Sequence, residues 1–154
     1  MDQVKAAIRI IADDRESAGG VIEELRRFSD VTVDVQRLAV GDFLVEGRIA
    51  VERKSLKDFV STVIHDHERF GREMLLLSTY EHSCVVVEAD LDAVLRGKCG
   101  DDLRGVKPES VLGAALHLTL QYSVPVCWCG SRQAARAFTE MYLRMAVRKE
   151  VPHV

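Results

Sequence analysis

The stretch that most constrains the fold covers residues 41–54 and reads GDFLVEGRIAVERK. Two short apolar runs, residues 43–45 and 49–51, flank a turn that contains a glycine, a pattern that predicts a β-hairpin. Antiparallel pairing would bring Asp42, at the start of the first strand, close to Glu52, near the end of the second. The hairpin therefore predicts a pair of neighbouring carboxylates at one edge of a sheet.

The charged end of this hairpin is a candidate site for chemistry. Glu52 and Lys54 share one face of the expected strand and Arg53 takes the other, because side chains alternate along a strand. A hard divalent cation binds carboxylate oxygens, and a lysine ammonium can hold a nucleophile or a developing negative charge. An isolated Glu-Arg-Lys sequence is more often a solvated strand end, so the rest of the chain decides between the two interpretations.

Length and composition favour one globular domain over residues 1–154. Hydrophobic residues make up 47% of the chain and charged residues 29%. No apolar run approaches the roughly 20 residues that span a bilayer, and the N-terminus lacks a signal-peptide layout. The four cysteines include no CxxC pair and fit reduced thiols. We therefore expect a soluble cytoplasmic protein that does not associate with membranes.

Strand and helix patterns alternate along the chain. The expected strands cover residues 6–12, 31–38, 43–45, 49–54, 84–88 and 124–129. The expected helices cover residues 21–28, 56–64, 69–80, 91–95 and 108–122, with a last helix after Ser131. This order predicts an α/β fold with a mixed central sheet flanked by helices, in which the hairpin is antiparallel.

Acidic residues follow more than one of these strands. The segment Asp13–Glu16 ends the first strand, and Asp42 and Glu52 mark the hairpin. An acid followed about ten residues later by a Glu-x-Lys strand is typical of the restriction-endonuclease-like PD-(D/E)xK core. The short pattern is weak alone, but here an Asp-x-Arg-Glu segment precedes it and Asp58 follows it. The combined order is much more specific.

Three motifs resemble those of the XPF-type structure-specific endonuclease family. ADDRE, VGDF and ERKSLKDF stand at residues 12–16, 40–43 and 52–59. The resemblance continues through RFGRE, VVE, SVLG and VPV, so it covers nearly the whole chain. It is closest to stand-alone bacterial or phage versions of the nuclease domain, which lack the helix-hairpin-helix domain common in the family.

The resemblance implies a role for each residue of these motifs. Asp42 and Glu52 would be the principal ligands of Mg²⁺ or Mn²⁺. Asp13 and the main-chain carbonyl of Arg53 would assist them. Lys54 would orient the attacking water or stabilise the phosphorane. The metal would act as a Lewis acid and lower the pKa of its bound water.

Three further side chains are given roles in the same way. Arg15 would contact a phosphate, and Glu16 would support the site. The Arg53 side chain, facing away from the carboxylates, would be structural or would pair with Asp58. Phe43 stands where the family has tyrosine, a change that keeps the ring.

The resemblance implies a metal-dependent DNA endonuclease that hydrolyses phosphodiester bonds in branched, flapped or otherwise structured DNA during repair or recombination. One alternative is a catalytically silent subunit that binds DNA and dimerises, although the acids and Lys54 are retained. A type II restriction-like enzyme is a further alternative, without a visible recognition segment. The net charge of −3 leaves little surplus positive charge for DNA binding.

Residues 112–120 and the last helix carry more apolar side chains than one side of a sheet needs. In the family this region forms a homodimer or heterodimer interface, and we expect a homodimer, with a heterodimer as the alternative.

Other motifs have a simpler interpretation. His65 and His67 could bind a transition metal, but a polar loop at the edge of the site is the preferred interpretation. Cys127 and Cys129 would share one strand face, where packed thiols are more common than a metal site. His117, on a mostly apolar helix, is expected to lie partly buried in the core.

Overall fold

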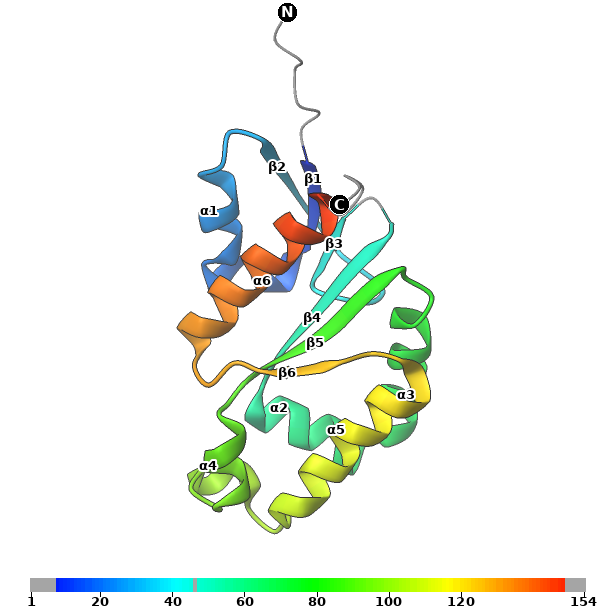
Figure 1. The fold of residues 1–154 in the computed structure, drawn as a ribbon, viewed down its shortest axis with the longest axis vertical. Helices are drawn as coiled ribbons and strands as arrows, with labels where there is room; N and C mark the ends of the chain where they lie inside the picture. The colour runs from blue at the N-terminus through cyan, green and yellow to red at the C-terminus, as the bar shows by residue number, and fades with distance from the viewer. Residues whose placement is uncertain (1–7, 46, 149–154) are drawn as a thin grey trace, which may run out of the picture.

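The computed structural model describes residues 8–45 and 47–148, which form an α/β fold around one six-stranded sheet (Figure 1). The strands are β1 (Ile8–Asp13), β2 (Val31–Gln36), β3 (Phe43–Val45), β4 (Ile49–Ser55), β5 (His82–Glu88) and β6 (Val126–Trp128). The α-helices are α1 (Val21–Arg26), α2 (Leu56–Val60), α3 (His67–Leu77), α4 (Leu91–Leu95), α5 (Pro108–Tyr122) and α6 (Arg132–Arg148). The shorter elements are two 3₁₀ turns, η1 (Asp14–Gly19) and η3 (Gly100–Leu103), and a π-helical turn, η2 (Ser61–His65).

The sheet is mixed, as the sequence predicts. Its strand order is β2-β1-β3-β4-β5-β6. β3 runs antiparallel to both β1 and β4, whereas the β1–β2, β4–β5 and β5–β6 pairs are parallel. The predicted hairpin is thus the antiparallel part of the sheet and places β4 near its centre. The predicted hairpin residue Glu46 and the first two residues of the predicted strand 6–12 lie outside the described residues.

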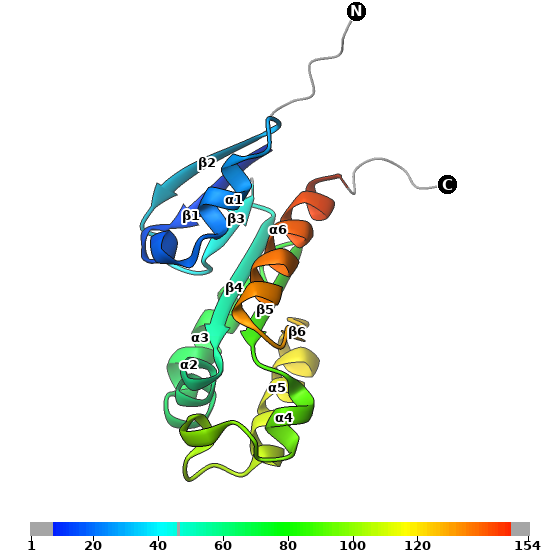
Figure 2. The same ribbon diagram turned by 90° about the vertical axis from the view of Figure 1, so that its left-hand side faces the viewer.

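Two hydrophobic cores lie on opposite faces of the sheet, and Figure 2 shows the helices that cover the sheet. α1 and α6 cover one face, and α2, η2, α3 and α5 cover the other. Successive residues of β4 belong to different cores: Ile49 and Val51 pack on the α1/α6 side and Ala50 on the α2/α3/α5 side. This alternation continues into the charged half of the strand. Glu52 and Lys54 therefore share the face of Ala50.

Helix starts were predicted better than loops. The Asp58 amide donates to Ser55 Oγ over 3.1 Å, so the expected Ser55 cap of α2 is confirmed. Pro108 begins α5, also as expected. The interpretation of residues 65–68 as a loop is wrong, since η2 extends to His65 and α3 begins at His67.

His117 was expected in the core and is instead exposed. The core-facing stripe of α5 consists of Val111, Ala115 and Leu118, and the helical period turns position 117 away from it.

No helix in residues 8–45 and 47–148 has the length and apolar composition needed to cross a membrane.

Phe59 joins the elements of the α2/α3/α5 core. Its ring is fully buried and packs edge-to-face against Phe70 and Trp128, with centroid distances of 6.2 Å and 5.7 Å.

Substitution Phe59→Ala should lower the free energy of unfolding by about 3–5 kcal/mol, because it leaves a cavity as well as losing apolar contact. Urea unfolding measures this loss. The control Phe138→Ala removes a partly buried ring from α6, and an equal or larger loss there would contradict the central position of Phe59.

Candidate active site

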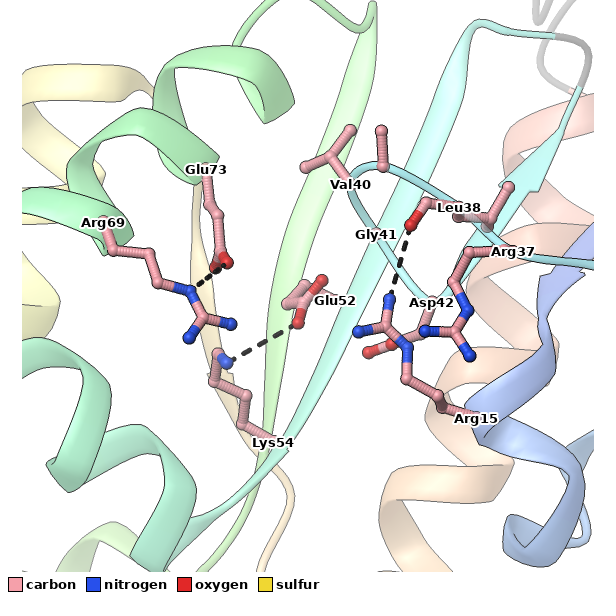
Figure 3. Close-up of a pocket in the computed structure, with 11 residues that line it drawn as sticks. Arg15, Arg37, Leu38, Val40, Gly41, Asp42, Glu52, Lys54, Arg69 and Glu73 are labelled. Atoms are coloured by element: carbon pink, nitrogen blue, oxygen red, sulfur yellow. Dashed lines mark hydrogen bonds and ion pairs between the residues drawn. The ribbon is translucent and has the colours of Figure 1, made fainter. Parts of the chain in front are cut away.

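A polar pocket of about 460 Å³ lies beside the charged half of β4 (Figure 3). Four parts of the chain line it: η1, the segment between β2 and β3, the strand β4, and the helix α3. The lining residues, with Arg15 from η1, are Arg15, Arg37, Leu38, Ala39, Val40, Gly41, Asp42, Glu52, Lys54, Arg69 and Glu73. The pocket thus collects Asp42, Glu52 and Lys54, as the hairpin pattern predicts.

Asp42 immediately precedes β3 and extends the β3–β4 pairing by one position. The last β3–β4 pair is Phe43 with Val51, and β4 runs on to Ser55 against β5 alone. The Asp42 amide donates to the Val51 carbonyl over 2.8 Å. The Arg53 amide then donates to Asp42 Oδ2 over 2.7 Å. The Asp42 carboxylate therefore takes the place of a backbone carbonyl of a neighbouring strand as acceptor for the Arg53 amide. This hydrogen bond fixes the carboxylate beside Glu52.

Gly41 permits this approach. Its φ of +75° lies in the left-handed region, where a side chain is strained. A Cβ atom at this position would sit 3.3 Å from Leu44 Cδ2. The chain can therefore turn into Asp42 without displacing β3.

The two pocket carboxylates have raised pKa values. Burial, followed by the negative charge of Glu52, raises the pKa of Asp42 to about 8. Burial also raises the pKa of Glu52 to about 7, and the Lys54 ammonium, 3.6 Å from Glu52 Oε1, only partly opposes this rise. The pocket therefore holds two neighbouring carboxyl groups whose ionisation a bound cation would favour.

This donor set fits a hard divalent cation. Among the described residues, no three His, Cys, Asp or Glu side chains are arranged to hold a metal by themselves. Mg²⁺ commonly binds one or two carboxylates and completes its shell with water and substrate phosphates. Asp42 and Glu52 match that requirement.

Asp13 has a different environment from Asp42. It is fully buried and absent from the pocket lining. Its oxygens accept hydrogen bonds from the Arg15 amide (3.1 Å), Arg15 Nε (2.6 Å), Arg15 Nη2 (3.1 Å) and the Leu38 amide (2.9 Å). Burial alone would raise the pKa of Asp13, but the bonds from Arg15 and Leu38 lower it to about 2. Asp13 therefore holds Arg15 and Leu38 in place.

Arg53 points to the opposite face of the sheet, as the alternation predicts. Its predicted partner Asp58 is wrong: Nη2 lies 2.9 Å from Glu16 Oε2, and Nη1 lies 3.3 Å from Glu88 Oε1. Asp58 belongs to the exposed first turn of α2, whereas the Arg53 side chain is only 9% exposed. Burial raises the pKa of Glu16 and the Arg53 charge opposes that rise. Glu16 thus acts on the strand from behind the pocket.

Lys54 is held from two directions. Its Nζ lies 3.6 Å from Glu52 Oε1 and 5.7 Å from the centroid of the Phe70 ring. A cation over an aromatic face is attracted by the ring quadrupole. The ammonium is therefore positioned at the pocket by β4 and α3 together.

Sequence reasoning gave no role to three residues of the pocket. Arg37 directly follows β2, and Arg69 and Glu73 lie on α3. Arg69 and Glu73 are four residues apart in a helix, a spacing that predicts an ion pair. Arg69 Nε lies 3.3 Å from Glu73 Oε1, but this spacing alone does not indicate which surface the pair faces.

The comparison with known families identifies the fold. The model of the ERCC4 domain matches residues 12–141. The chain belongs to the ERCC4 domain family. Its six-stranded sheet with flanking helices is accordingly an XPF nuclease fold of the restriction-endonuclease-like class, as expected from the motifs.

Similar proteins are consistent with this family. The chain is 34% identical over 121 residues to the 3'-flap repair endonuclease Xpf of Saccharolobus solfataricus, a match that covers 77% of this chain and 47% of that protein. The chain thus spans about half the length of this relative. Among solved structures, XPF from Aeropyrum pernix superposes with a TM-score of 0.72 at 25% identity, covering 95% of this chain and 64% of that one. The same protein in complex with DNA gives a TM-score of 0.69 at 25% identity, covering 96% and 68%.

Substitution Gly41→Ala should lower the free energy of unfolding by about 1–2 kcal/mol, because a left-handed backbone with a Cβ is strained. It should also speed hydrogen exchange of the Arg53 amide, whose acceptor is Asp42. Gly47→Ala is the control: its φ is +69°, but an added Cβ meets nothing within 4 Å. Protection of the Arg53 amide that falls equally in both variants would show that Gly41 does not position Asp42.

Proposed function

We propose that this ERCC4 domain is a Mg²⁺- or Mn²⁺-dependent DNA endonuclease that hydrolyses phosphodiester bonds in branched, flapped or otherwise structured DNA during repair or recombination. The observation that carries the proposal is the pairing of Asp42 and Glu52, both with raised pKa values, beside Lys54 in one pocket. Two similar proteins support it: one is named a 3'-flap repair endonuclease, and the other was solved with DNA.

Asp42 and Glu52 are the metal ligands in this proposal, with the main-chain carbonyl of Arg53 as a third oxygen donor. A bound divalent cation supplies Lewis-acid chemistry and lowers the pKa of bound water. Asp42 Oδ2 already accepts the Arg53 amide, so Asp42 Oδ1 is its freer oxygen. Asp13 was expected to assist these ligands, but its oxygens already accept N–H groups from Arg15 and Leu38, so we assign it a positioning role instead.

Lys54 orients the attacking water or stabilises the negative charge that develops on the phosphorane. The Arg15 side chain is 57% exposed although its partner Asp13 is buried, so its outer N–H groups are available to a DNA phosphate. Glu16 supports the site through Arg53, which lies next to both Glu52 and Lys54 in β4. The roles divide by face: β4 presents the reacting groups on one side and their support on the other.

Cleavage assays on forked, flapped, nicked and linear duplex DNA, with Mg²⁺ or Mn²⁺, test this function on the chain as it stands. Cutting near a junction or flap is the expected result, and it would also show that the domain acts without a helix-hairpin-helix domain. Cutting at one fixed sequence in linear DNA would favour a restriction-like enzyme. Binding without cleavage under either metal would favour the silent scaffold.

A cytoplasmic location stays a prediction.

Asp42→Asn and, separately, Glu52→Gln should each reduce cleavage by about 100-fold or more, since even outer-shell partners of metal ligands cost 10–100-fold. Both changes keep the side-chain shape, so thermal unfolding should show a folded domain. Asp34→Asn is a matched control, because Asp34 pairs with Arg9 at the sheet edge outside the pocket. Full activity of either pocket variant would remove that residue from the metal site.

Lys54→Ala should lower the cleavage rate by about 100-fold, the lower range for a group that assists proton transfer. Metal affinity, measured by calorimetry in the absence of DNA, should change much less. Lys57→Ala, at the second position of α2 and outside the pocket lining, is the control. A parallel loss of metal binding and rate would instead assign Lys54 a structural role.

We further propose that the domain forms a homodimer around the edge strand β6. α5 and α6 flank this edge on the two faces of the sheet and carry exposed apolar side chains (Figure 1). Leu116 and Leu120 of α5 are 52% and 84% exposed, and Met141 and Met145 of α6 are 59% and 64% exposed. Such a group of apolar side chains is typical of an interface.

Sedimentation velocity should give twice the mass of the chain, and Leu120→Glu should give a monomer, because the dimer would bury the new charge. Leu95→Glu, on α4, is the control for adding a carboxylate at an exposed leucine. A monomeric unsubstituted chain with DNA cleavage intact would exclude the homodimer and leave a heterodimer.

A further inference from the structure

Two arginines of the pocket have no role in the function proposed above. Arg37 and Arg69 line opposite walls, with Asp42 and Glu52 between them (Figure 3). Their side chains are 67% and 63% exposed. Both guanidinium groups are therefore accessible at the edge of the pocket.

Each arginine directly precedes a buried residue that fixes the position of its backbone. Arg37 precedes Leu38, which is 7% exposed and donates its amide to Asp13 over 2.9 Å. Arg69 precedes Phe70, which is 2% exposed and packs against Phe59. The backbone at both positions is thus held by the core, while the guanidinium groups stay in solvent. Such a side chain loses little additional backbone entropy when it binds a ligand.

Each guanidinium group forms an ion pair with a carboxylate that a DNA phosphate could replace. Arg37 Nε lies 2.8 Å from Asp14 Oδ1, and Arg69 Nε lies 3.3 Å from Glu73 Oε1. Exposed ion pairs of this kind contribute little to stability and are screened by salt. A DNA phosphate can offer each guanidinium a bidentate charge-assisted pair in place of the acid. These pairs can therefore open when a DNA backbone enters the pocket.

We propose that Arg37 and Arg69 bind backbone phosphates on either side of the scissile phosphate. One DNA strand then crosses the pocket from the segment between β2 and β3 to helix α3 and passes over Asp42 and Glu52. This inference rests on the proposed function, because it places the scissile phosphate at these two carboxylates. It assigns the binding of the neighbouring phosphates to two side chains that are not among the proposed metal ligands.

The test measures binding of fluorescently labelled flapped DNA by anisotropy, in EDTA so that no metal-dependent cleavage occurs and no divalent cation competes. Affinity is followed between about 50 and 200 mM KCl. Arg37→Ala and Arg69→Ala should each weaken binding by about 5-fold and reduce the slope of log K against log salt by about 1. The double variant should reduce the slope by about 2, because the two sites lie on opposite walls and are independent.

Arg72→Ala is the matched control. It removes the same charge from the same helix as Arg69→Ala, and Arg72 is exposed but does not line the pocket. Its affinity and salt slope should stay close to those of the unsubstituted chain. Arg37→Lys and Arg69→Lys should retain the slope, because they keep the charge, and this separates phosphate binding from a folding defect.

A salt slope for Arg37→Ala or Arg69→Ala equal to that of Arg72→Ala would overturn the inference. A slope lost equally in the alanine and lysine variants would overturn it too, since the effect would then be structural. A chain that binds DNA with these two contacts but never cleaves it would refute the proposed endonuclease and leave the phosphate contacts standing. Cleavage with no effect of either alanine variant would refute only the phosphate contacts.

Discussion

The hydrogen bond from the Arg53 amide to the Asp42 carboxylate, at 2.7 Å, joins the two halves of the pocket. β4 extends beyond β3, so the Arg53 amide faces no β3 carbonyl that could accept its hydrogen bond. Without the Asp42 carboxylate, this backbone donor would be left without an acceptor. The side chain of Asp42 supplies the acceptor and ties the segment between β2 and β3 to β4 next to Glu52. One contact therefore completes the sheet and positions a carboxylate for chemistry.

Two aspartates from different motifs have pKa values shifted in opposite directions. Asp13 accepts hydrogen bonds from Arg15 and Leu38, and its pKa falls to about 2. Asp42 is also largely removed from solvent but faces Glu52, and its pKa rises to about 8. The charge of Asp13 is thus satisfied within the protein, whereas that of Asp42 favours an external cation. Their main chains are in direct contact, since the Asp13 amide donates to the Asp42 carbonyl over 2.8 Å.

The sequence predicts those features that depend on local periodicity. The hairpin, the shared face of Glu52 and Lys54 and the Ser55 cap all follow from alternation or from short-range hydrogen bonding. The partners of Arg53 could not be predicted, because they arrive from η1 and β5, far away in the chain. The position of Arg69 could not be predicted either, because its place in the pocket depends on how α3 packs through Phe70. A pattern gives the face of a side chain but not what lies opposite that face.

The separation of Glu52 and Lys54 from Arg53 on the two faces of β4 also bears on the fidelity of folding. The apolar half of the strand could accept a shift of one residue, since both faces are buried in a core. The charged half could not. A shift that moves Glu52 into the place of Arg53 would set it beside Glu16 and Glu88 and separate Arg53 from both, and breaking a buried ion pair costs about 3–5 kcal/mol. The opposite shift would put Lys54 there, and an ammonium lacks the planar fork with which a guanidinium reaches both acids. The residues that make this strand chemically useful thereby also exclude its nearest misfolded alternative.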